Sequence, residues 1–288
     1  MWSARKFSAD EHQTIARLAA HNTMFSIFQY SFIQNAFLAG SVVAVVGGFV
    51  GYFLITRGLT FAGHALSHIG FAGAAAALLI GIDPIFGMLA FTIIAGAGIG
   101  VFGKELREED INIGIVMTLM LGLGALFIAL YNGYAEQAYS ILFGTILGIS
   151  RTDVLITLIF GIATIVALTA IFRPLLFSSV DPEVAEARGV PVRALGIFFL
   201  ILVAVAVSMS VEVVGVLLIF TLLVGPAAAA MRIVHNPLGA VATSIGLALA
   251  YTWLGIFLAA TGSWPVTFYI ATISFVVYLP VRLLTARR

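Results

Sequence analysis

The chain has 288 residues, of which 61% are hydrophobic and only 9% are charged, and its net charge is +1. Soluble domains carry about 25% charged residues because water must wet their surface, so this composition excludes a soluble globular protein and indicates an integral membrane protein. The chain has no cysteine, which excludes disulfides, thiolate metal sites and thiol catalysis. The near-neutral charge also gives no basic surface for nucleic acid.

Residues 1–30 form an N-terminal extension before the first long apolar stretch. Met1–Lys6 runs into polar sequence rather than an apolar core, so we expect no cleavable signal peptide. Ser8 and Glu11 have the spacing of a capping box, and the stretch up to Asn22 predicts an amphipathic helix at the membrane surface. We interpret residues 31–288 as one transmembrane domain.

Apolar stretches long enough to cross the hydrocarbon core, which takes about 20 residues, follow one another along the rest of the chain. They are Ser31–Thr56, Gly58–Ile82, Pro84–Gly103, Ile111–Ala135, Val154–Phe172, Ala194–Val211, Val213–Ile233 and Asn236–Val281. The last is long enough for two helices, and Thr261–Pro265 supplies a turn between them. The sequence therefore predicts an all-α polytopic membrane protein with about nine transmembrane helices.

The basic residues lie at alternate ends of these stretches, and among them are Arg57, Lys104, Arg107, Arg173, Arg188, Arg193, Arg232 and Arg282. Because Lys and Arg accumulate in cytoplasmic loops, these ends and the C-terminus should be cytoplasmic, and the N-terminal extension external. Ala138–Ser150 is apolar but too short for a crossing, and a crossing there would move Arg173–Arg193 outside. We therefore expect a re-entrant or partly inserted segment.

The second stretch contains the run Gly63–His68, in which His64 and His68 stand four residues apart. On a helix they share one face, and two imidazoles at that spacing can touch one metal ion. The alternative is that each histidine bonds a carbonyl of a neighbouring helix. Ionisable groups inside a membrane usually line a pathway, so we favour a metal pathway formed by His64, Ser67 and His68.

The cytoplasmic segment Asp181–Val190 has a defined helix start and stop. Asp181 suits the N-cap, Pro182 the first helical position and Gly189 the left-handed position after the helix. These start and stop signals predict a short rigid helix, which we interpret as a docking helix for a cytoplasmic partner. The alternative is a capped surface helix without a partner.

Glu212 is expected at the outer end of the Val213–Ile233 helix, where the N-terminal dipole would accommodate its charge. With Glu136 at another external end, it is a candidate to receive an incoming cation or a delivery protein. The sequence contains no phosphate-binding loop and no nucleophile–base pair, so we expect a transport subunit rather than an enzyme.

Four segments, taken together, resemble the zinc/manganese-type ABC permease family. They are Gly58–His68, Phe143–Leu147, Asp181–Gly189 and Val214–Leu218 with Pro226 and Ala227. They occur in the family's order, and the resemblance covers roughly residues 32–284. It implies that residues 31–288 form the permease domain of an ATP-driven importer in the plasma membrane, the inner membrane of a bacterium.

The resemblance also implies partners and site residues. The partners would be a second copy of the chain, a cytoplasmic ABC ATPase dimer and an extracytoplasmic metal-binding protein. The coupling helix would comprise Asp181, Pro182, Glu183, Ala185, Arg188 and Gly189, with its apolar face against the ATPase. His68 matches the family's histidine, whereas His64 stands where many members carry Asp. Because imidazole is the softer ligand, zinc is the expected substrate, with manganese or iron as alternatives and no permanently bound cofactor.

Two rival functions remain open at this point. An ion-coupled secondary metal transporter would need protonatable groups within the membrane, and the sequence offers few besides His64, His68 and Asp153. A permease for metal chelates or siderophores would share the docking helix but would need a wide cavity.

Overall fold

The computed structural model describes residues 30–102, 109–131 and 141–285, and every regular element in these ranges is a helix. The helices are α2 (Ser31–Thr56), α3 (Thr60–Leu79), α4 (Pro84–Phe102), α5 (Glu109–Leu130), α7 (Arg151–Val180), α8 (Pro182–Ala187), α9 (Val192–Val214), α10 (Val216–Ile233), α11 (Pro237–Thr261) and α12 (Val266–Thr285). All except α8 are long and apolar enough to cross a membrane, which gives nine spans in the described ranges. The predicted fold class is confirmed.

Helix ends follow local signals that the sequence carries. The α7 helix begins with a capping box in which Ser150 and Asp153 bond each other's backbone N–H. The side chain of Asn236 caps α11 in the same way by accepting from Gly239. The α7 helix continues past the apolar stretch to Val180, because an apolar pattern marks only the part of a helix that lies in lipid.

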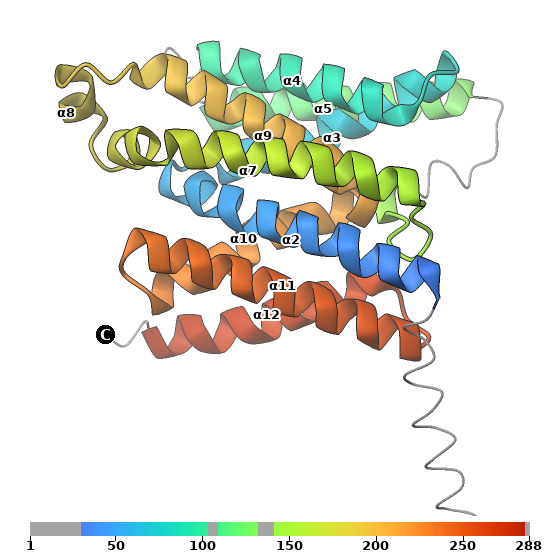
Figure 1. Cartoon of the computed structure of the whole chain (residues 1–288). Coiled ribbons are helices and arrows are strands. Elements are labelled where there is room, and N and C mark those ends of the chain that lie inside the picture. The colour runs from blue at the N-terminus through green and yellow to red at the C-terminus, as the bar shows by residue number, and fades with distance from the viewer. Residues whose placement is uncertain (1–29, 103–108, 132–140, 286–288) are drawn as a thin grey trace, which may run out of the picture.

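The helices run side by side with α2 near the middle of the bundle (Figure 1). The α2 helix packs against α7, α9, α10 and α11, whereas α3 packs mainly against α4 and α5, and α4 against α9. The most deeply buried spans are α2, α3 and α9, while α5 and α12 are mostly exposed. The α3 helix is one of these buried spans, and its two histidines are half-buried.

Small residues let α3 and α4 approach closely. A Cβ added at Gly73 would collide with the carbonyl oxygen of Gly87, and a Cβ at Gly87 would collide with that of Gly73. Between apolar helices in lipid, such close backbone contact is a main source of association. Gly73 belongs to the run Gly70–Ala77 of α3, which is rich in small residues and is mostly buried.

Replacing Gly87 by alanine is expected to lower the melting temperature of the purified chain in detergent, because the added methyl meets the backbone of α3. Overpacking of this kind costs about 1–3 kcal/mol. Gly98 lies on the same helix, and a Cβ there meets no atom within 4 Å, so Gly98→Ala is a matched control that should melt like the wild type. Equal melting temperatures for the two variants would contradict the close contact.

Most of the described arginines lie at one end of the bundle, as the sequence predicts. Helices α2, α4, α7, α10 and α12 end at the side where α8 protrudes, and α3, α5, α9 and α11 begin there (Figure 1). Arg57, Arg188 and Arg232 belong to this end, which is the predicted cytoplasmic end, whereas Arg151 begins α7 at the opposite end. The chain therefore has α8 and its C-terminal helix end on one side.

Residues 141–150 lie at the opposite, external end and do not cross the bundle. They lead into α7, which begins at that end, and Gly144 packs against the backbone of Val214 and Gly215 where α9 gives way to α10. Gly144 and Gly215 both have positive φ, of 75° and 81°, and each leaves no room for a Cβ. The described part of the segment does not form a crossing, as predicted, but it is helical only at residues 141–143.

Three predictions fall outside the described residues. These are the amphipathic helix in the N-terminal extension, the position of Glu136 and the first part of the Ala138–Ser150 segment.

Candidate transport site and coupling helix

The two histidines of α3 meet as their spacing predicts. The ring centroids of His64 and His68 are 4.6 Å apart, with the rings at right angles. Both side chains are half-buried, and the ring of His64 also lies 4.9 Å from that of Phe220 on α10. The imidazoles therefore form one group at the junction of α3 and α10.

Each histidine has an Nδ1 atom that is buried and has no hydrogen-bond partner among the described residues. The alternative of a carbonyl bond is thus not realised at these two nitrogens. A neutral imidazole with an unpartnered ring nitrogen retains a lone pair or a proton that it can exchange for a metal bond. The pair is chemically available for transient ligation.

Ser67 occupies a different environment. Its side chain is fully buried, and its hydroxyl donates to the carbonyl oxygen of His64 at 2.6 Å. This bond stabilises the turn of α3 that carries both imidazoles. A ligand role for Ser67 stays a prediction.

No group of three or more His, Asp or Glu side chains in the described ranges is close enough to hold a metal ion. The histidine pair therefore offers two ligands from one chain, and Glu212 does not join it. Two ligands suit a transport site, which must release its ion, better than a permanent structural site, which takes four.

The structure corrects the placement of Glu212. It lies in the last turn of α9, and the chain breaks at Gly215 before α10 begins. The N-terminal dipole explanation is therefore wrong, because a helix C-terminus disfavours a negative charge. Gly215 was the signal that could have placed this boundary, since an isolated glycine often ends a helix.

Glu212 lines a cavity of about 170 Å³ at the external end of the bundle. Its Oε2 atom is buried and has no hydrogen-bond partner among the described residues. Thr145 and Asp153 line the same cavity from the re-entrant segment and from α7. The sequence carried no signal for this grouping, because the three residues come from separate elements and meet only through tertiary packing.

The short cytoplasmic helix α8 has the predicted start and stop. The carboxylate of Asp181 accepts from the backbone N–H of Val184 at 3.0 Å, Pro182 is the first helical residue, and Gly189 has φ of +83°. The helix protrudes from the bundle at its cytoplasmic end (Figure 1). Its geometry is that of a rigid projecting element.

One predicted contact residue of α8 is corrected. Ala185 is fully buried against the chain itself, so it cannot insert into a partner. The outward positions are Val184 and Ala187, together with the acids Glu183 and Glu186. The sequence could not show this because a six-residue helix between two spans can turn any of its faces inward.

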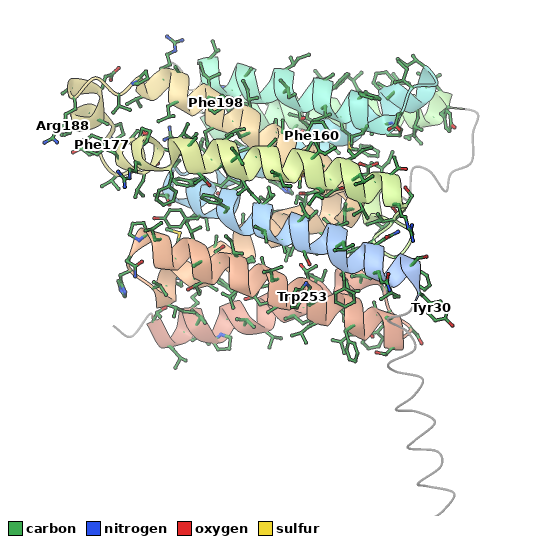
Figure 2. All side chains as sticks on the ribbon, in the orientation of Figure 1. Tyr30, Phe160, Phe177, Arg188, Phe198 and Trp253 are labelled. Atoms are coloured by element: carbon green, nitrogen blue, oxygen red, sulfur yellow. The ribbon has the colours of Figure 1, made fainter. Side chains whose placement is uncertain are left out.

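Arg188 attaches the end of α8 to the preceding span. Its guanidinium carbon lies 6.0 Å from the ring centroid of Phe177 on α7, a cation–π distance, and both side chains lie at the cytoplasmic end (Figure 2). This contact holds α8 on the end of α7.

Comparison with known proteins decides the family. Residues 29–285 match the sequence model of the ABC 3 transport family. The chain belongs to this family. Together with its apolar spans, the membership makes this permease a multi-pass protein of the plasma membrane.

Relatives and a solved structure support the membership. The manganese transport system membrane protein MntC of Listeria monocytogenes is 33% identical over 78% of this chain and 84% of the relative. The manganese import system permease protein ScaB of Streptococcus parasanguinis is 31% identical over 78% of this chain and 83% of the relative. The solved structure of PsaBC from Streptococcus pneumoniae in complex with Fab superposes with a TM-score of 0.82 and 28% identity, covering 91% of this chain and 95% of that one.

These relatives are named for transport rather than catalysis, in keeping with the expectation of a permease subunit. Their names specify manganese, so the expectation of zinc is not confirmed.

Proposed function

We propose that this permease conducts a divalent first-row metal ion inward as the membrane subunit of an ATP-driven importer, with manganese as the first candidate. The observation that carries the proposal is the half-buried pair of imidazoles on α3, each with an Nδ1 that finds no partner in the described part of the chain. The names of relatives that are 31% and 33% identical support manganese.

Zinc is the competitor, for a chemical reason. A nitrogen ligand pair binds Zn²⁺ more tightly than Mn²⁺, which prefers carboxylate and water oxygens. The two histidines bind manganese weakly, and weak binding suits a site that must release its ion within one transport cycle. A zinc importer with the same ligands would need a mechanism that weakens the site as it opens inward.

The transport site is completed by a second copy of the chain. One chain supplies two imidazoles, and their side chains are half-exposed on the face of the single chain. Polar groups facing lipid are costly, whereas a second permease copy on this face would cover them and add its own pair. The ion would then pass between the two copies.

The cycle uses both ends of the permease. A binding protein docks at the external end and releases its metal, and a cytoplasmic ATPase dimer receives α8. ATP-driven closure of the ATPases displaces α8, and the spans on either side carry the displacement into the membrane. Because α8 is capped at its start and stop, it moves as a rigid body.

The decisive experiment reconstitutes the permease with its cognate ATPase and binding protein in proteoliposomes. We expect accumulation of radioactive manganese only with ATP and loaded binding protein, and excess zinc tests competition. Accumulation by the permease alone, driven by a proton or sodium gradient, would overturn the proposal in favour of a secondary transporter. Uptake of a chelated metal without free-metal uptake would favour the chelate permease.

Glu212 is expected to assist entry of the cation at the external end. Replacing it by glutamine removes the buried carboxylate from the cavity, and we expect initial uptake at low salt to fall about three- to tenfold, the effect of one charge at a focusing site. Asp110→Asn removes an exposed acid at the start of α5, on the cytoplasmic side, and should leave uptake unchanged. Equal initial uptake by Glu212→Gln and the wild type would contradict the prediction.

A further inference from the structure

Arg57 occupies the short connection between α2 and the helix that carries the histidine pair. It directly follows α2, and only Gly58 and Leu59 separate it from Thr60, where α3 begins. The turn is closed by a backbone bond from Leu59 to the carbonyl of Leu54 at 2.8 Å, and Gly58 has φ of +70°. Because the connection is short and hydrogen-bonded, a displacement of Arg57 also displaces the start of α3.

The guanidinium of Arg57 contacts both helices that flank α8. Its Nη1 donates to the hydroxyl of Ser178 at 3.0 Å and to that of Ser179 at 3.3 Å, both in the last turn of α7. Its Cζ lies 5.9 Å from the ring centroid of Phe199 on α9. Asp181, the cap of α8, follows Ser179 by two residues, so the contact lies at the base of the projecting helix.

The contact is incompletely satisfied in this arrangement. The Nε atom of Arg57 is buried and has no hydrogen-bond partner among the described residues. Burial lowers the pKa of Arg57, but a guanidinium stays charged at neutral pH. A buried donor without a protein partner is available for a new hydrogen bond when the neighbouring helices shift. The orphan donor fits a group that exchanges partners between two arrangements.

We propose that Arg57 is a positioning residue that carries the displacement of α8 to the start of α3. This inference rests on the proposed function, because it needs an ATPase that moves α8. When the ends of α7 and α9 shift, the guanidinium shifts with the two serines and moves the α2–α3 turn. His64 lies one helical turn beyond Thr60. The imidazoles of His64 and His68 therefore change position when α8 moves.

The test uses the complete complex of permease, ATPase and binding protein in proteoliposomes, and it measures metal transported per ATP hydrolysed. Arg57→Gln is expected to retain ATP hydrolysis while transport per ATP falls about tenfold, within the range of coupling between distant sites. Arg57→Lys, with a single ammonium that cannot reach both serines in the same way, should lie between. Arg232→Gln is the matched control, an exposed arginine in the last turn of α10 bonded to Thr285, and should behave like the wild type.

A second variant tests whether the serines act through the same contact. Ser178→Ala with Ser179→Ala should lower transport per ATP, and adding Arg57→Gln to this pair should cost less than Arg57→Gln alone, because the serine bonds are already broken and only the contact with Phe199 remains to be lost. Fully additive losses would overturn the proposal, as would a wild-type ratio in Arg57→Gln. A wild-type complex that transports metal without ATP would overturn the proposed function instead.

A distance measurement separates transmission from simple stabilisation. The chain has no cysteine, so spin labels at Thr60→Cys and at the exposed Val180→Cys, placed in one of the two permease copies of the complex, report the distance between the start of α3 and the end of α7. With Arg57 present this distance should stay the same on ATP binding, because the two helices move together. In Arg57→Gln it should change on ATP binding, whereas an unchanged distance would contradict the role of Arg57.

Discussion

Replacing both His64 and His68 by alanine is expected to abolish most metal uptake while the permease still inserts and assembles. The two imidazoles are the only pair of metal-binding side chains at this junction of α3 and α10 in the described part of the chain. Loss of groups that only orient a metal ligand already costs about 10–100-fold in affinity or activity, so loss of both ligands should cost at least as much. The measurement is initial uptake in proteoliposomes with loaded binding protein.

The control for this prediction is another histidine of the same chain. His235 is exposed between α10 and α11 at the cytoplasmic end, and His235→Ala should transport like the wild type. Assembly is checked by the amount of ATPase that co-purifies with each variant. Full uptake by the double variant would show that the ion does not use these imidazoles.

A related single change tests metal choice. His64→Asp replaces a nitrogen ligand by the carboxylate that many family members carry by resemblance. Because carboxylate oxygen favours Mn²⁺ over Zn²⁺, competition by zinc should weaken while manganese uptake persists. Stronger competition by zinc would contradict a ligand role for His64.

The second large effect is expected at the outward face of α8. Val184→Glu or Ala187→Glu places a charge on the exposed side of the helix, where the ATPase is proposed to dock. An unpaired charge buried at an interface costs about 2–5 kcal/mol, enough to lose most of the co-purifying ATPase and its stimulation by loaded binding protein. The permease alone should keep its melting temperature, because both side chains are exposed on the single chain.

Two further variants serve as controls for the loss of ATPase binding. His235→Glu adds the same charge to the cytoplasmic end away from α8 and should retain the ATPase. Ala185→Glu should instead lower the melting temperature of the permease alone, because Ala185 is fully buried within the chain. If Val184→Glu and Ala187→Glu both keep wild-type co-purification and stimulation, α8 is not the coupling element.

The amino-acid sequence by itself determined the features that depend on neighbours along the chain. Apolar length set the spans, and the arginines predict their orientation. The caps of α8 are short-range hydrogen bonds between residues at most a few positions apart, such as Asp181 with Val184. The meeting of His64 and His68 follows in the same way from the helical repeat.

Only the tertiary structure decided which face of each helix is turned inward and which distant residues meet. In a membrane both the core and the lipid are apolar, so the hydrophobic pattern of a span does not mark its buried side. The burial of Ala185 and the contact of Arg57 with Ser178 depend on how α8, α2 and α7 pack together, which no local signal in the sequence specifies. The shared cavity of Asp153 and Glu212 likewise depends on the packing of α7 beside α9, whose residues no local signal relates.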